Sequence, residues 1–254
     1  MAESKSSAVA SGFGRTLRRD SWWFEVLPTI IGLGGFGIYA TLRAFEGKYF
    51  DGTSLHLPYL SPFYSPLIDT GGLWPYSPAL LILVFPLGFR ITCYYYRKAY
   101  YRAFFFDPPA CAVGEPRHKY RGETKFPFVL QNIHRYFLYF AVIFLCFLWK
   151  DAIVSFWWDG HFGIGLGSLV LLINIILLTL YLLSCHSLRH LVGGKLDCFS
   201  CTASNQTRHG LWKKVSSLNE RHMLFAWCSL FSVGFADFYV RLVTSGAFTD
   251  PRLW

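Results

Sequence analysis

Long apolar stretches separated by polar segments dominate the pattern of this chain. The clearest runs from Phe162 to Cys185, and its roughly 24 residues, at 1.5 Å each, cross about 30 Å of hydrocarbon. Four more stretches are also apolar and long enough for a membrane span. None of them alternates between apolar and polar residues as a barrel strand would. The pattern predicts an all-α integral membrane protein, a bundle of about five transmembrane helices over residues 26–44, 77–96, 134–158, 162–185 and 221–243.

Composition agrees with a membrane protein. The chain is 53% hydrophobic and only 15% charged, whereas about a quarter of the residues of a soluble domain are charged. The net charge of +9 then indicates basic loops on one side of a membrane rather than a nucleic-acid partner.

The distribution of Lys and Arg predicts the orientation. The N-terminal tail and the loops after the second and fourth predicted spans are basic, whereas the loops after the first and third are not. The positive-inside rule therefore predicts a cytoplasmic basic tail over 1–22, a membrane domain over 23–246 and an extracytoplasmic tail over 247–254, in the cell inner (plasma) membrane. Residues 1–20 do not resemble a signal peptide, and no disulfide framework is expected on the cytoplasmic side.

This topology gathers most of the potential metal ligands at the cytoplasmic membrane edge. Spans two to five all begin or end there, and a cytoplasmic loop adds one more thiol. The cofactor-ligand candidates are Cys93, Cys111, His134, Cys185, His186, His190 and His222.

Two local motifs at this edge have open interpretations. His186 and His190 are four residues apart, so with Cys185 they form a metal-binding candidate if the helix continues past Cys185. They could equally be interfacial histidines. Cys198 and Cys201 could hold zinc or one corner of an iron–sulfur cluster, or they could be ordinary loop thiols.

Charged and aromatic residues add a second candidate site. Arg90 lies inside a span, about one turn from Cys93, and an intramembrane charge is costly unless it is paired or faces a polar cavity. Asp237 and Arg241 are expected to pair with each other. The tyrosines at the cytoplasmic edge form either an aromatic belt or a quinone pocket, with the quinone-binding candidates Arg90, Tyr94, Tyr95, Arg135 and Tyr136.

Several blocks of sequence resemble the membrane-anchor (cytochrome b-type) subunit of actinobacterial-type succinate dehydrogenases. The resemblance runs from about residue 20 to the C-terminus, and the hydrophobic spans alone do not carry it. The blocks are CYYYRKAYYR at 93–102, PPAC at 108–111, QNIHRYF at 131–137, CHSLRH at 185–190 and NERH at 219–222.

The resemblance implies a partner set and a reaction. A flavoprotein subunit would oxidise succinate, and an iron–sulfur subunit would pass the electrons to the membrane. This chain would anchor both at its cytoplasmic face and reduce a quinone, menaquinone or ubiquinone, with menaquinone favoured. It would be an enzyme only as the membrane subunit of a succinate:quinone oxidoreductase, with no succinate site of its own.

The histidine pattern of this chain departs from the cofactor set usual for the family. Related five-span anchors hold two b haems, which need histidines near both membrane faces, but the outer side here offers only His56 and His161. The adjacent cysteines favour a Rieske-type [2Fe–2S] centre, which takes two Cys and two His ligands. One b-type haem, or no cofactor beyond quinone, is the alternative.

Two readings from other classes stay open at this point. A non-redox transporter or channel would use Arg90, Lys150 and Asp237 as a charged path. A purely structural anchor would carry a zinc-stabilised loop built on Cys198, Cys201 and His209.

Overall fold

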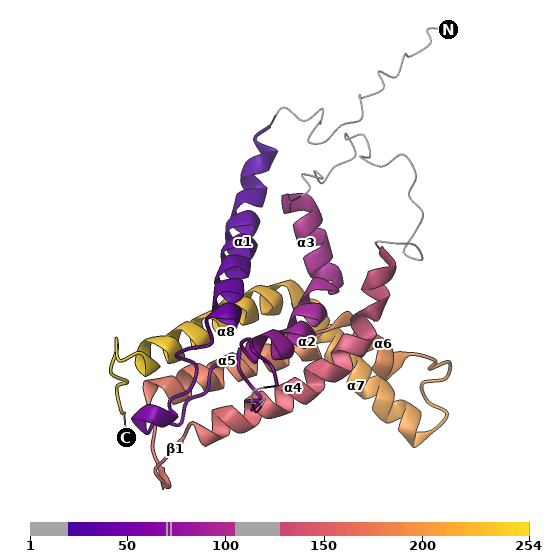
Figure 1. Ribbon diagram of the computed structural model, residues 1–254. Helices are drawn as coiled ribbons and strands as arrows, with labels where there is room; N and C mark the ends of the chain where they lie inside the picture. The colour runs from indigo at the N-terminus through magenta and orange to yellow at the C-terminus, as the bar shows by residue number, and fades with distance from the viewer. Residues whose placement is uncertain (1–19, 70, 72, 105–127, 254) are drawn as a thin grey trace.

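The computed structural model describes residues 20–69, 71, 73–104 and 128–253, and the chain is helical over most of them (Figure 1). This confirms the all-α membrane fold class. The small sheet in these residues pairs β1 (Trp157–Trp158) with β2 (His161–Phe162). The helices are α1 (Trp22–Glu46), α2 (Ala79–Ile91), α3 (Tyr94–Phe104), α4 (His134–Val154), α5 (Leu166–Leu183), α6 (His186–Gly193), α7 (Ala203–Asn219) and α8 (His222–Thr244), with short 3₁₀ turns η1 (Thr53–Leu55) and η2 (Phe128–Ile133).

Four helices in the described part of the chain are long and apolar enough to cross a membrane: α1, α4, α5 and α8. Apolar α2 has only 13 residues. A helix of that length reaches about 20 Å, less than the roughly 30 Å of a hydrocarbon core. By length alone, α2 falls short of a full span.

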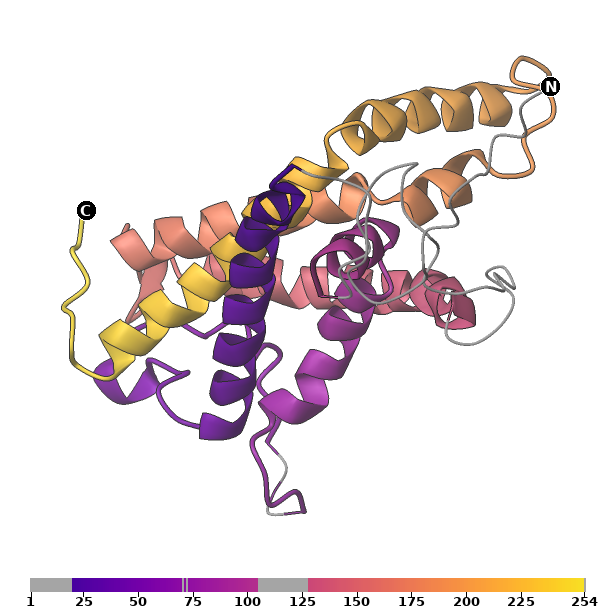
Figure 2. The ribbon, with the colours of Figure 1, turned by 90° about the horizontal axis from the view of Figure 1, so that it is seen from above.

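The helix predicted over residues 77–96 breaks at Thr92 and Cys93. The Thr92 N–H group makes the normal helix bond to the Gly88 carbonyl at 3.1 Å, and the Thr92 hydroxyl donates to the same carbonyl at 2.6 Å. A hydroxyl that bonds the carbonyl four residues earlier often bends a helix. α3 then begins at Tyr94 and packs beside α1 (Figures 1 and 2). Cys93 consequently lies at a bend between two helices.

The segment between α4 and α5 is a tight hairpin instead of helix. Asp159 and Gly160 have φ angles of 47° and 84°, and Asp-Gly is a dipeptide that favours such turns. Trp158 pairs with His161 across the strands. The predicted spans 134–158 and 162–185 are therefore shortened here, to Val154 and from Leu166.

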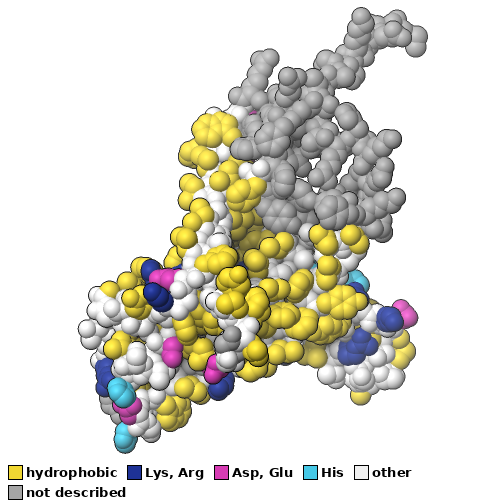
Figure 3. All heavy atoms as spheres, viewed as in Figure 1, with side chains coloured by type: hydrophobic (Ala, Val, Ile, Leu, Met, Phe, Trp, Pro, Cys, Tyr) yellow, Lys and Arg dark blue, Asp and Glu magenta, His cyan; other side chains and the backbone are white. Residues whose placement is uncertain are grey.

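α5 is the central helix of the bundle, packed between α4 and α8, while α2 packs on α4. α1 crosses α8 steeply in both ribbon views (Figures 1 and 2), and it projects away from the bundle in Figure 1. On the face shown in Figure 3, apolar side chains cover the middle of the bundle, and charged ones gather at its two ends. This distribution is that of a protein surrounded by lipid.

The end of the bundle that carries the C-terminus contains a buried ionic network. Asp237 and Arg43 are 0% and 1% exposed, and Arg43 Nε donates to Asp237 Oδ2 at 2.8 Å. Tyr39 and Ser61 also donate to the Asp237 carboxylate. Arg241 instead binds Glu46, at 2.8 Å, so the predicted Asp237–Arg241 pair is replaced by pairs that join α8 to α1.

The C-terminal tail folds back onto the start of α5. The N–H group of Leu166 bonds the Pro251 carbonyl at 3.0 Å, and Gly167 N–H bonds Asp250 Oδ1 at 2.9 Å. Tyr59 and Tyr239 donate to the same carboxylate. Asp250 thus caps α5 and fixes the tail.

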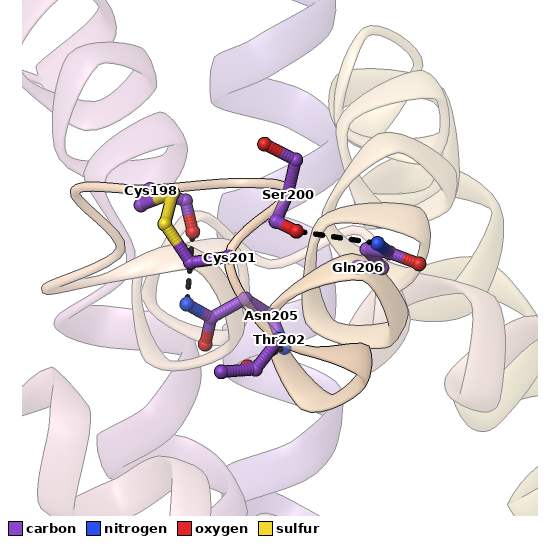
Figure 4. Close-up of a disulfide and its surroundings, with 6 residues drawn as sticks. All are labelled: Cys198, Ser200, Cys201, Thr202, Asn205 and Gln206. Atoms are coloured by element: carbon purple, nitrogen blue, oxygen red, sulfur yellow. Dashed lines mark hydrogen bonds between the residues drawn. A yellow bond between two sulfur atoms is a disulfide. The ribbon is translucent and has the colours of Figure 1, made fainter.

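The opposite end, called the α6 end below, carries two helices that were predicted as loop. α5 stops at Leu183, and α6 and α7 form a helical hairpin before α8. Cys198 and Cys201 are joined by a disulfide just before α7, contrary to the expectation for this loop (Figure 4). Asn205 Nδ2 donates to the Cys198 carbonyl at 2.8 Å, which ties the disulfide to the first turn of α7.

Candidate functional site

Four chain breaks meet at the α6 end, and each carries a Cys or a His. Cys93 lies between α2 and α3, and Cys185 lies between α5 and α6. His134 and His222 begin α4 and α8. Because these helices pack together with their ends at one level, residues more than a hundred positions apart come into contact.

His134 is held between a hydroxyl and a thiol. Its Nδ1 lies 2.9 Å from Thr92 Oγ1 and its Nε2 lies 3.2 Å from Cys185 Sγ. The single hydroxyl hydrogen of Thr92 is already donated to the Gly88 carbonyl, so Thr92 must accept from His134. Nδ1 therefore carries the ring hydrogen, and the Nε2 lone pair faces Cys185. Phe89 stacks on the ring at 4.6 Å between centroids.

His222 repeats this arrangement with the other cysteine. Its Nδ1 lies 2.7 Å from Ser184 Oγ, and its Nε2 lies 3.4 Å from Cys93 Sγ. Ser184 donates its hydrogen to the Tyr181 carbonyl at 2.9 Å, so it too accepts from the imidazole. The Nε2 lone pair of His222 accordingly faces Cys93.

The two thiols are buried and neutral. Burial raises the pKa of Cys185 to about 11, although the N–H groups of Ser187 and Leu188 at the start of α6 act in the opposite direction. Burial likewise raises the pKa of Cys93. Each S–H can therefore donate toward the facing Nε2, and a metal would have to displace both protons.

A cation and phenols surround this quartet of Cys93, His134, Cys185 and His222. Arg90 donates to Tyr96 Oη at 2.8 Å and to Ser229 Oγ at 3.1 Å, and it lies 4.7 Å from the Tyr181 ring centroid. No carboxylate of the described residues forms a salt bridge with Arg90. The site consequently has a positive charge available to stabilise negative charge.

The buried Tyr181 hydroxyl lies beside Cys93 and has no hydrogen-bond partner of good geometry among the described residues. Burial raises the pKa of Tyr96 to about 12, so this phenol is also protonated, and it donates to the Ala226 carbonyl at 2.6 Å. The Tyr181 hydroxyl is thus placed to donate toward the Cys93 sulfur.

The remaining predicted ligands lie apart from the quartet. His186 and His190 are exposed on α6, with ring centroids 6.1 Å apart. The disulfide leaves neither Cys198 nor Cys201 as a thiolate, so a zinc site or cluster corner on them is not available in this state. Cys111 lies outside the described residues. Within the described residues, no three His, Cys, Asp or Glu side chains are grouped to hold one metal ion.

The predicted quinone residues are divided between interior and surface. Arg90 lies beside the quartet, and the Tyr95 hydroxyl accepts a bond of 2.7 Å from Trp227 Nε1. Tyr94, Arg135 and Tyr136 lie on the exposed surface of the first turns of α3 and α4. The five predicted quinone residues therefore lie around one end of the bundle, and they do not line a single enclosed pocket.

The comparison with known families decides the identity. Residues 24–246 match the family described as actinobacterial succinate dehydrogenase subunit SdhC. The chain belongs to this family. A chain of the Mycobacterium smegmatis Sdh1 complex in the apo form is similar to this SdhC-family chain, with 46% identity, a TM-score of 0.83, and coverage of 95% of this chain and 98% of that one. A search of curated proteins found no match.

The SdhC-family chain is therefore a multi-pass membrane subunit of a succinate dehydrogenase complex, which is an oxidoreductase with other Sdh subunits.

The hydroxyls that hold the imidazoles were not predicted from sequence. Thr92 directly precedes Cys93, and Ser184 directly precedes Cys185. Each hydroxyl holds the histidine that contacts the other cysteine. The repeated hydroxyl–cysteine dipeptide was a signal in the SdhC-family sequence that could have identified both.

Proposed function

We propose that this chain is the membrane anchor and quinone-reducing subunit of succinate dehydrogenase, with Cys93, His134, Cys185 and His222 as ligands of a Rieske-type [2Fe–2S] centre. The observation that carries the proposal is the pairing of two buried thiols with two imidazoles whose Nε2 lone pairs face them. Such a centre would accept one electron at a time from the iron–sulfur subunit, at a potential raised by its histidine ligands.

The donor set fits this group chemically. A two-iron centre takes one pair of thiolates and one pair of imidazoles, so it does not require three ligands around one ion. Thr92 and Ser184 fix both rings in the tautomer that leaves Nε2 free, as outer hydrogen bonds do for metal-binding histidines. Arg90 supplies positive charge beside the thiols.

A single b-type haem at the same histidines has less support. Haem would need both Nε2 atoms facing one another across a flat macrocycle, but here each faces a cysteine thiol. Both rings are also stacked, His134 on Phe89 and His222 on Tyr181. A compact two-iron core requires a smaller opening between these helices than a macrocycle does.

Quinone reduction needs donors close to the centre and a route for two protons. Arg90, Tyr95 and Tyr96 lie beside the quartet, and Tyr94, Arg135 and Tyr136 border it at the surface. These groups can hold quinone oxygens and pass protons, and menaquinone is the favoured quinone. A flavoprotein and an iron–sulfur subunit would dock at this end, which the positive-inside rule predicts to be cytoplasmic together with the N-terminus.

EPR spectroscopy of the purified complex tests the cofactor. We expect wild type to give, after reduction, the low average g value of a His-ligated [2Fe–2S] centre. Cys185→Ser, Cys93→Ser or His222→Gln should abolish this signal, because each removes one ligand. His190→Gln is the matched control and should leave it unchanged. The assignment is wrong if the signal survives the loss of Cys185 or His222, or if b-type haem absorbance appears instead.

A further inference from the structure

The α6 end also carries a surface pocket, separate from the quartet. It is a cavity of about 320 Å³ between α6 and α7, lined by His186, Arg189, His190, Gly193, Gly194 and Trp212. We propose that this pocket binds the phosphate group of an anionic phospholipid. The inference does not depend on the cofactor proposed above.

The pocket is built around one cation. Arg189 Nε donates to Ser216 Oγ at 2.9 Å, and the guanidinium lies 5.1 Å from the Trp212 ring centroid. These contacts orient Arg189, and its Nη atoms donate no hydrogen bond to another described residue. No carboxylate lines the pocket, and in the described part of the chain Arg189 forms no salt bridge. An oriented, unpaired guanidinium is the side chain best suited to phosphate.

The carbonyl groups at the end of α6 would otherwise repel an anion. Arg208, from α7, satisfies them: its Nε donates to the Val192 carbonyl at 3.1 Å and its Nη2 to the Gly194 carbonyl at 2.8 Å. Even as neutral rings, His186 and His190 each carry one N–H donor. The lining of the pocket is therefore rich in donors.

The position of the pocket favours a lipid over a soluble anion. α6 begins three residues after the membrane-spanning helix α5 ends, which is the level expected for phospholipid headgroups. Trp212 is an aromatic residue typical of that level. Leu191, Phe199 and Leu211 are also exposed on the hairpin, as in segments that lie in a membrane interface.

The charge of the hairpin matches an anionic headgroup. Residues 186–219 contain a single acidic residue, Asp197. Basic residues near a membrane surface attract anionic lipids over a Debye length. The basic residues of this segment are Arg189, Lys195, Arg208, Lys213 and Lys214.

Lipid titration of the delipidated complex tests the proposal. Nanodiscs of phosphatidylcholine alone and with added phosphatidylglycerol are compared, with bound lipid counted by native mass spectrometry. We expect Arg189→Gln to weaken phosphatidylglycerol binding about ten- to hundredfold, the effect of losing a charge-assisted hydrogen bond. Lys48→Gln removes the same charge from an exposed position at the opposite end of the bundle and should change binding less than twofold. His190→Gln, which leaves the Arg189–Ser216 bond in place, should weaken it severalfold.

Three results would overturn the assignment. Equal retention of phosphatidylcholine and phosphatidylglycerol would show that the pocket does not select an anion. Arg189-dependent stabilisation by inorganic phosphate alone, equal to that by phosphatidylglycerol, would assign it to a soluble anion. Release of the soluble subunits by Arg189→Gln, with lipid binding unchanged, would assign it to the interface with those subunits.

Discussion

At the residue scale, two hydroxyl groups set the orientation and the tautomer of the two histidines in the quartet. Thr92 and Ser184 each donate to a backbone carbonyl and accept from a histidine Nδ1. Because the hydroxyl has only one hydrogen, both imidazoles are held with the N–H on the far side from the cysteines. The arrangement of the quartet therefore depends on two small polar side chains that no metal or quinone would contact.

Thr92→Val tests this dependence. Valine keeps the shape of threonine but removes the acceptor, which leaves a buried imidazole N–H unpaired at a cost of about 1–3 kcal/mol. We expect a lower melting temperature of the purified complex. Thr41→Val is the control, since Thr41 also bonds the carbonyl four residues earlier, at 2.7 Å, but holds no histidine. Equal shifts for the two variants would contradict the role given to Thr92.

At the element scale, the close approach of α2 to α4 sets the position of the site. A Cβ atom on Gly88 would lie 2.3 Å from the Phe137 ring, so only glycine fits here. α2 carries Arg90, Thr92 and Cys93 to the start of α4, where His134 begins the helix. The short α2 thus matters more for placing these side chains than for spanning the membrane.

Gly88→Ala should separate these two helices. The overpacked methyl group is expected to cost about 1–3 kcal/mol, and the shift of α2 should weaken the Thr92–His134 contact. Thermal melting of the complex measures the loss. Gly210→Ala is the control, because a Cβ atom on Gly210 meets nothing within 4 Å and alanine favours the helix. A melting temperature for Gly88→Ala at or above the wild-type value would refute the packing argument.

At the scale of the whole molecule, α1 is attached to the bundle by an ionic network at its C-terminal end and by apolar contacts along its length. Among the described side chains of α1, only Val26, Arg43 and Ala44 are buried. The C-terminal end of α1 is tied to α8 by the Arg43–Asp237 pair and by the Glu46–Arg241 pair. Breaking a buried pair is costly because it leaves one charge without its partner. The ionic network therefore fixes the C-terminal end of α1 to α8.

Arg43→Met should lower the stability by about 3–5 kcal/mol, because Asp237 remains buried without its cation. The double variant Arg43→Met, Asp237→Leu should recover most of this loss. Arg241→Met, at a half-exposed pair, should cost about 1 kcal/mol or less. Fluorescence-detected size exclusion after a temperature series reports the fraction that stays folded. No recovery in the double variant would show that the network acts through more than its charge pair.

Sequence alone determined the fold class, the family and the end of the bundle where the Cys and His side chains of the quartet gather. Hydropathy and charge are local properties, so they can be read without knowing any contact. The Cys and His residues at helix ends were identified in the same way, since topology places helix ends at one membrane face. The sequence showed that a charged Asp237 inside a span needs a partner, but it did not identify Arg43 as that partner.

Only the tertiary structure decided which of these residues meet. The helix breaks at Thr92 and after Leu183 leave Cys93 and Cys185 buried at the junctions between helices. The same break after Leu183 puts His186 and His190 on a separate helix, α6, where both are exposed. Arg43 reaches Asp237 only because α1 crosses α8. Such contacts depend on where helices end and at what angle they pack, and hydropathy along one segment contains no information about the position of another.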